Sequence, residues 1–189
     1  MCSALDYYRN RIDMTLNELA LKYGSDKSSE GHNYMPFYEK HLPKNPKSIL
    51  EVGVLKGASI EIWRNYFPDT FIYGLDLFNE FPIPQIDNVK FFRGSQLDEH
   101  ILYDIRNNVR PEIIIEDASH NCASHWVTLM SLIGTCKLYF IEDLHTCRDE
   151  FYRQDLKFEQ TVLGAMLSGK FPFEFELSES QEIAVIKNI

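Results

Sequence analysis

The sequence has 189 residues, of which 44% are hydrophobic and 25% are charged. This length suits one domain of roughly 100–200 residues, and the composition is that of a globular protein rather than a collagen or a disordered tail. No run approaches the ~18 apolar residues of a membrane-spanning helix, so we expect no membrane partner. The N-terminal stretch MCSALDYYRNRIDM lacks the apolar core of a signal peptide, which favours a cytoplasmic protein.

Acidic residues outnumber basic ones, 28 against 19, and the formal net charge is −9. This average field repels a polyanion, and no Lys/Arg-rich run offsets it locally, so we expect a small-molecule partner and no nucleic acid. The cysteines form no C-x-x-C pair, which argues against a disulfide framework or a structural zinc site. We expect reduced thiols at all four positions, which are Cys2, Cys122, Cys136 and Cys147.

Residues 1–42 combine short helical patches with the polar, aromatic stretch GSDKSSEGHNYMPFYEKHL. Pro43 and Pro46 separate this segment from the first predicted strand. The segment is too short and polar for a separate domain. We therefore predict an N-terminal arm or cap at 1–42, folded over the sheet edge, and a catalytic domain at 43–189, the two forming a single domain overall.

From residue 48 onward, short β-branched runs alternate with segments of helical length, which is the pattern of a parallel sheet flanked by helices. This predicts strands at 48–54, 71–77, 88–94, 112–119 and 137–144. Helices are expected over SIEIWRNYF and at about 98–109, 124–133 and 155–168. The runs at 173–177 and 182–188 predict a terminal antiparallel hairpin. The fold class is α/β, a Rossmann-like and mostly parallel seven-stranded sheet.

In an open parallel sheet, ligands bind outside the carboxyl ends of the strands. The first strand leads into EVGVLKGAS, where Gly53 and Gly57 precede a helix N-terminus, as in a nucleotide-binding glycine loop. Asp76 ends the second strand, where a carboxylate can grip a ribose diol. These features predict a nucleoside-containing ligand. The missing middle glycine of G-x-G-x-x-G disfavours a nicotinamide dehydrogenase.

This motif, E-x-G-x-x-x-G with an acid ending the next strand, resembles the class I S-adenosylmethionine-dependent methyltransferases. More narrowly, four stretches resemble the metal-dependent macrolide-sugar O-methyltransferases of the mycinamicin and macrocin type and their cephalosporin-hydroxylase-like relatives. They are SDKSSEGHNYMPFYEKHL, ILEVGVLKGASIEIWRNYFPDTFIYGLDL, IIIEDASH and YFIEDLHT. The D-x-S-H and I-E-D-L-H motifs at successive strand ends are the most specific part of the resemblance.

The resemblance implies S-adenosyl-L-methionine as methyl donor and Mg²⁺ held by Asp117, Glu142 and Asp143, with His120 as the general base. Magnesium prefers carboxylate ligands and acidifies a hydroxyl bound to it, and a histidine can then accept the proton near neutral pH. Adjacent residues on a strand point to opposite faces, so Glu142 and Asp143 can share an ion only if the strand ends before them.

We expect further contacts with the cofactor and the acceptor around these strand ends. The cofactor contacts are predicted at Glu51, Gly53, Gly57, Ser59, Asp76, Gln96 and Tyr34, and the substrate contacts at His145 and Tyr38. In the arm, Lys27, His32, Tyr34 and Tyr38 resemble the S/T-D-K…H-x-Y pattern of the family. That pattern fits closure over cofactor or substrate and fits docking of the arm to the core equally well.

The sequence departs from these relatives at two strand ends. Glu116-Asp117-Ala118 stands where they often have Asp-Asp-Gly, and Gly94-Ser95-Gln96 stands where they tend toward Gly-Asp-Gln, so the adenine contacts stay open.

We expect methylation of a sugar hydroxyl in a polysaccharide precursor or a glycosylated natural product. The alternatives are a catechol-type O-methyltransferase, which typically uses a lysine base, and a non-catalytic nucleoside-binding protein on the same fold. The acceptor, the methylated position and the oligomeric state, a homo-oligomer included, also stay open.

Overall fold

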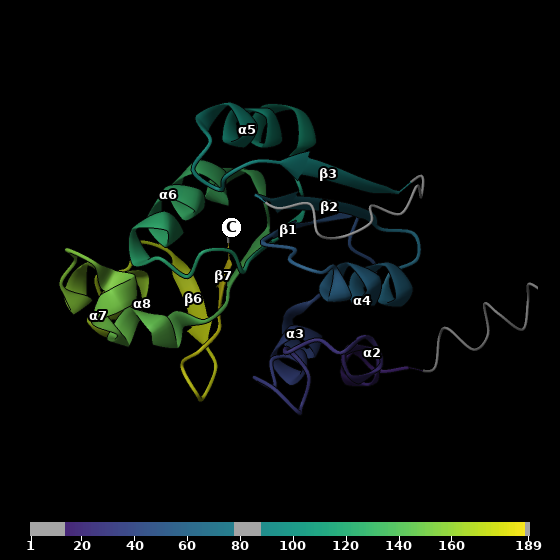
Figure 1. The fold of residues 1–189 in the computed structure, drawn as a ribbon, viewed down its shortest axis with the longest axis horizontal. Helices are drawn as coiled ribbons and strands as arrows, with labels where there is room; N and C mark the ends of the chain where they lie inside the picture. Colours follow the sequence, from purple (N-terminus) through teal and green to yellow (C-terminus); the bar gives the residue numbers. More distant parts are fainter. Residues whose placement is uncertain (1–13, 78–87, 188–189) are drawn as a thin grey trace, which may run out of the picture.

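The computed structural model describes residues 14–77 and 88–187. Their seven-stranded sheet has the order β3-β2-β1-β4-β5-β7-β6 (Figure 1). The strands are β1 Ser48–Val52, β2 Phe71–Asp76, β3 Val89–Arg93, β4 Ile113–Glu116, β5 Leu138–Ile141, β6 Glu174–Leu177 and β7 Ala184–Lys187. The first five are parallel, and β7 pairs antiparallel with both β5 and β6. This confirms the predicted fold class.

The helices are α2 Leu16–Tyr23, α3 Met35–His41, α4 Ala58–Tyr66, α5 Glu99–Asp104, α6 Cys122–Leu132, α7 Glu150–Arg153 and α8 Val162–Leu167. A π-turn, Ile105–Val109, extends α5, and 3₁₀ turns lie at Ile133–Thr135, Leu144–Arg148 and Phe158–Gln160. Side-chain oxygens of Thr15, Asp98, Asn121 and Thr161 accept backbone N–H bonds at helix starts. Among the helices that the structure describes, none is long and apolar enough to cross a membrane.

Two of the sequence predictions need correction. The helix predicted at 155–168 is interrupted, because Thr161 starts α8 as a new N-cap after the 3₁₀ turn. The strands predicted at 112–119 and 137–144 are shorter, ending at Glu116 and Ile141. The acids that follow these two strands therefore lie in turns at the carboxyl edge of the sheet.

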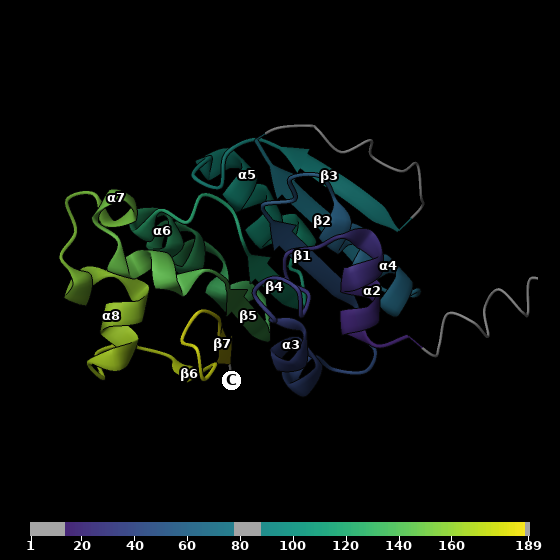
Figure 2. The same ribbon diagram turned by 60° about the horizontal axis from the view of Figure 1, so that its bottom comes forward.

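The sheet carries an apolar core on each face. Leu50 and Val52 of β1 pack with residues of α5, α6 and α8, whereas Ile49 packs with residues of α2, α3 and α4. Figure 2 shows α2 and α3 near α4, apart from α6, α7 and α8. The arm shares its core with the sheet, since the fully buried Met35 and Tyr38 belong to the same cluster as Ile49. It therefore covers part of a sheet face, whereas the prediction placed it over the sheet edge.

Gly53 gives a first testable prediction about this fold. Its φ is +94°, and a Cβ atom there would overlap the backbone carbonyl of Asp117. Gly53→Ala should therefore lower the free energy of unfolding by more than about 3 kcal/mol, since backbone strain and a clash with main chain add. Chemical denaturation measures this. The matched control is Gly134→Ala, where a Cβ meets nothing within 4 Å; equal stability of the two variants would contradict the prediction.

Candidate functional site

A cavity of about 1040 Å³ opens at the carboxyl ends of the central strands, where the strand order reverses between β1 and β4. This is the expected ligand position in an open α/β sheet. Its walls come from the arm, the glycine loop and the turns after β2, β3 and β4, with residues 24–27, 52–56, 75–77, 94–97 and 117–121.

Asp76 lines the cavity and also fixes the glycine loop. Its Oδ2 atom accepts hydrogen bonds from the backbone N–H groups of Val54 and Leu55, both at 2.7 Å. Leu55 has a left-handed backbone, with φ +49°, and the loop ends at Gly57, with φ +80°, immediately before α4. The carboxylate that was predicted to grip a ribose thus holds the loop in the shape that forms the cavity wall.

Two of the predicted cofactor contacts, Glu51 and Gly57, lie outside the described lining of the cavity. Glu51 is fully buried, and burial raises its pKa to about 7 although the nearby Lys27 charge opposes this. Gly53 and Ser59, in contrast, belong to the described lining.

Gln96 lines the cavity, but its amide is used within the protein. Its Oε1 accepts from the Ser119 N–H at 3.0 Å, and its Nε2 donates to Glu116 Oε1 at 3.0 Å and to Thr128 Oγ1 at 3.1 Å. Gln96 therefore positions the turn after β4, which carries His120, and its predicted contact with the cofactor stays a prediction.

The three predicted metal ligands lie just beyond β4 and β5. Because β5 ends at Ile141 and Asp143 has φ +54°, the chain turns between the two consecutive acids. The strand thus ends before the two acids, as the prediction requires, but Glu142 is not in the group of candidate ligands that Asp143 joins. One side-chain atom each of Asp117, His120 and Asp143 lies within 4.8 Å of the others. His120 also has a left-handed backbone, with φ +54°, which is uncommon for a non-glycine residue and typical of functional turns.

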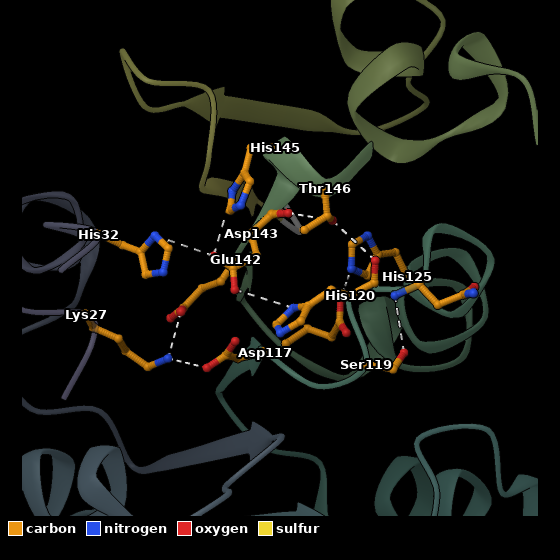
Figure 3. Close-up of polar contacts among 12 residues, drawn as sticks. Lys27, His32, Asp117, Ser119, His120, His125, Glu142, Asp143, His145 and Thr146 are labelled. Carbon is orange, nitrogen blue, oxygen red and sulfur yellow. Dashed lines mark hydrogen bonds and ion pairs between the residues drawn. The ribbon is translucent and has the colours of Figure 1, made fainter. Parts of the chain in front are cut away.

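The arm supplies hydrogen-bond donors to all three acids, and Figure 3 shows those of Lys27 to Asp117 and Glu142. Lys27 Nζ contacts Asp117 Oδ2 and lies 2.7 Å from Glu142 Oε2. The Tyr38 hydroxyl donates to Glu142 Oε1, and the Tyr34 hydroxyl donates to Asp143 Oδ1 at 2.7 Å. Burial and the neighbouring carboxylates raise the pKa of both tyrosines, so they remain donors.

Tyr34 and Tyr38 support the acids of the site through these hydrogen bonds. Both are buried, and neither belongs to the described lining of the cavity. Their contacts with cofactor or substrate stay predictions. The S/T-D-K…H-x-Y pattern was the signal for this arrangement, but it does not reveal which acid each side chain meets.

Three histidines surround Asp143. His120 Nδ1 lies 3.4 Å from its Oδ2, while His145 Nδ1 and His32 Nδ1 lie 3.9 and 4.0 Å from its Oδ1. The ring of His32 stacks against those of Tyr34 and His145, with centroids 5.1 and 5.9 Å apart. His120 is part of the cavity lining, and His145 is not among the described lining residues. The sequence analysis named His32 only as part of the arm pattern.

The donor set fits a hard divalent ion. Asp117 and Asp143 provide carboxylate oxygens on the cavity wall, and such oxygens are the ligands that Mg²⁺ prefers. His120 Nδ1 is buried, and no hydrogen-bond partner for it exists among the described residues. The neighbouring Glu116 points elsewhere, toward Gln96 and toward His125 Nε2 at 3.6 Å.

Comparison with known proteins identifies homologues. No family model matches the chain. It is 33% identical over 146 residues to 8-demethyl-8-(2-methoxy-alpha-L-rhamnosyl)-tetracenomycin-C 3'-O-methyltransferase of Streptomyces olivaceus, which covers 69% of this chain and 37% of that protein. It is 29% identical over 145 residues to mycinamicin VI 2''-O-methyltransferase of Micromonospora griseorubida, covering 69% and 36%. The chain thus spans little more than a third of the length of these relatives.

A solved structure agrees with these relatives. The MycE methyltransferase of mycinamycin biosynthesis, in complex with Mg and SAH, superposes with a TM-score of 0.80 at 25% identity, over 92% of this chain and 54% of that one. This solved structure and the relatives found by sequence are all methyltransferases. The chain is therefore a homologue of part of the macrolide-sugar O-methyltransferases and has the fold of the methyltransferase MycE.

Proposed function

We propose that this protein is an S-adenosylmethionine-dependent O-methyltransferase that uses Mg²⁺ to methylate a sugar hydroxyl of a glycosylated natural product or a polysaccharide precursor. One observation carries the proposal. A single cavity has the glycine loop and Asp76 on its wall together with Asp117, His120 and Asp143. A methyl donor and a metal-bound acceptor would therefore meet in one enclosure. The sugar O-methyltransferase relatives and the Mg and SAH in MycE support it.

In the proposed reaction, each residue has a role that follows from its position in the cavity. Asp76 and the loop at Gly53 would bind the ribose end of the cofactor. Asp117 and Asp143 would hold Mg²⁺ beside Glu142, and the ion supplies Lewis-acid activation of the acceptor hydroxyl when bound. His120 takes the hydroxyl proton as general base. The methyl group passes in line from the sulfonium to the oxygen, so orientation of the two substrates supplies most of the remaining rate.

The state of Lys27 argues against this residue as a lysine base of the catechol type. Burial by itself lowers the pKa of Lys27, but the charges of Asp117, Glu142 and Glu51 outweigh it and hold that pKa well above its usual value. Lys27 therefore stays an ammonium ion and cannot accept the proton of an acceptor hydroxyl.

The direct test is methyl transfer from labelled S-adenosylmethionine, with Mg²⁺, to a panel of nucleotide sugars, glycosylated natural products and catechols. We expect label on a sugar hydroxyl. Label on the catechols alone would favour the catechol type, and cofactor binding without transfer to any acceptor would favour a non-catalytic nucleoside-binding protein.

Asp76 gives the prediction for the cofactor. Asp76→Ala should weaken binding of S-adenosylhomocysteine by roughly 10- to 100-fold, the effect of losing hydrogen bonds to a charged group. Isothermal titration calorimetry measures this. Asp69→Ala removes an exposed acid that lines a different cavity and should bind normally. Unchanged affinity of the Asp76 variant would refute the assignment of the ribose site.

A further inference from the structure

Lys27 is the arm residue most closely joined to the acids of the site. It lies in the turn after α2, and its backbone carbonyl accepts from the Tyr34 N–H at 3.0 Å. Its side chain is 3% exposed and bridges Asp117 and Glu142, which come from different strand ends (Figure 3). Burying a charge is costly unless it is paired, so the burial of Lys27 depends on its two acidic partners.

The charges around Lys27 are strongly unbalanced. Asp117, Glu142 and Asp143 lie together, and Glu51 is close enough to affect the same ammonium ion. Within the part of the chain that the structure describes, Lys27 supplies the only lysine or arginine nitrogen within 4.0 Å of these three acids at the site. Its single positive charge therefore offsets part of the negative charge that would attract a cation.

We propose that Lys27 determines how tightly the carboxylate site binds a divalent ion. Its ammonium group pairs with Asp117, a candidate ligand of the ion, and with the neighbouring Glu142, and it repels the ion at short range. The lysine keeps the acids paired and limits the affinity of the site for the ion. This inference rests on the ion site of the proposed function.

The physical argument predicts two opposite effects of neutralising Lys27. Without the ammonium ion, the buried carboxylate of Glu142 and the partly buried carboxylate of Asp117 lose their partner, which destabilises the fold. The same loss removes a repulsive unit charge from the neighbourhood of the ion. At an effective dielectric constant of about 20, the repulsion from a unit charge a few ångströms away weakens binding of the ion substantially. The variant should therefore be less stable alone and should gain more stability from the ion than the wild type gains.

The experiment uses the full chain and two neutral variants, Lys27→Met and Lys27→Gln, the second of which keeps a hydrogen-bond donor. Calorimetric titration with Mn²⁺ and with Mg²⁺ gives the affinity, and thermal unfolding with and without each ion gives the stability. We expect the ion to bind at least about tenfold more tightly to both variants than to the wild type. We also expect a lower Tm without the ion and a larger rise in Tm with it.

Two further variants serve as controls. Lys27→Arg keeps the charge and should leave the affinity for the ion near the wild-type value. Lys56→Met makes the same change of charge at an exposed lysine that lines the same cavity, and it should alter the affinity little. A similar gain in affinity for the Lys56 variant would mean that net charge alone sets the affinity, and this would overturn the inference.

Other outcomes also decide. Equal or weaker binding of the ion to the neutral variants would overturn the inference, as would variants that stay unfolded at every ion concentration, because the ion then does not replace the ammonium charge. A wild-type chain and variants that all fail to bind the ion would overturn it as well. These readouts do not depend on methyl transfer, so a failed acceptor panel with the expected affinities would contradict the proposed function alone.

Discussion

Replacing His120 with alanine should lower the rate of methyl transfer by roughly 10²–10⁴-fold, the usual contribution of a positioned general base. The side chain lines the cavity beside Asp117, and its Nδ1 lies 3.4 Å from Asp143 Oδ2. A hydroxyl held near these acids would meet the imidazole directly. Cofactor affinity should stay near the wild-type value, because the proposed cofactor contacts are the glycine loop and Asp76 and do not include His120.

The same structure groups His120 with Asp117 and Asp143 as a candidate ligand, so the experiment must separate a base from a ligand. Titration of the His120→Ala variant with Mn²⁺ does so. A base predicts a large loss of turnover with unchanged affinity for the ion, and a ligand predicts that the affinity falls as well. His120→Asn tests the fold independently, because asparagine tolerates the left-handed backbone of this position.

His145→Ala is the matched comparison for this measurement. His145 also approaches Asp143, at 3.9 Å, and it is outside the described lining of the cavity. Its loss should reduce turnover much less than loss of His120. Wild-type turnover in the His120 variant would show that the assignment is wrong, and a large defect in the His145 variant would then identify His145 as the base.

The sequence could predict the sheet and the location of the site because both follow from short-range patterns. Buried β-branched runs indicate parallel strands, and the ends of those strands meet at one edge. Asp117 and Asp143 are 26 residues apart, yet they belong to successive strand ends of neighbouring strands β4 and β5. Their proximity follows from that topology, and the structure brings both to one group with His120.

The partners of the arm could not be predicted in this way. Tyr34 meets Asp143 across 109 positions, and Tyr38 meets Glu142 across 104. No periodic pattern links a loop after a helix to an acid that far along the chain. A motif can show that arm residues belong together. Whether one of their side chains lines the cavity or bonds to a carboxylate depends on how closely the arm packs on the sheet face.

Gln96 and the segment at 155–168 illustrate the same limit on a local scale. A polar side chain at a strand end can face a ligand or bond to a neighbouring turn. For Gln96, the backbone N–H of Ser119 in the turn after β4 donates to its Oε1. The segment has helical composition throughout, but Thr161 caps a new helix where the chain has already turned. In both cases a backbone hydrogen bond outweighs the preference of the sequence pattern.

Removal of the divalent ion should abolish methyl transfer. In the Asp117→Ala variant, addition of the ion at moderate concentration should not restore it. Lewis-acid activation of a hydroxyl contributes several kcal/mol, so we expect turnover to fall by at least about 10³-fold. Chelation followed by addition of Mg²⁺ should restore the wild-type enzyme. The affinity for S-adenosylhomocysteine should change little, because the proposed contacts of that ligand are Asp76 and the glycine loop and do not include the Asp117 side chain.

Glu116→Gln is the matched control for Asp117→Ala, since it changes the preceding carboxylate on the same chain segment. Glu116 is buried and bonds to Gln96 on the side away from the acids, so its replacement should lower stability without lowering the affinity for the ion. If the Asp117 variant still methylates at the wild-type rate in chelator, no ion takes part in the reaction.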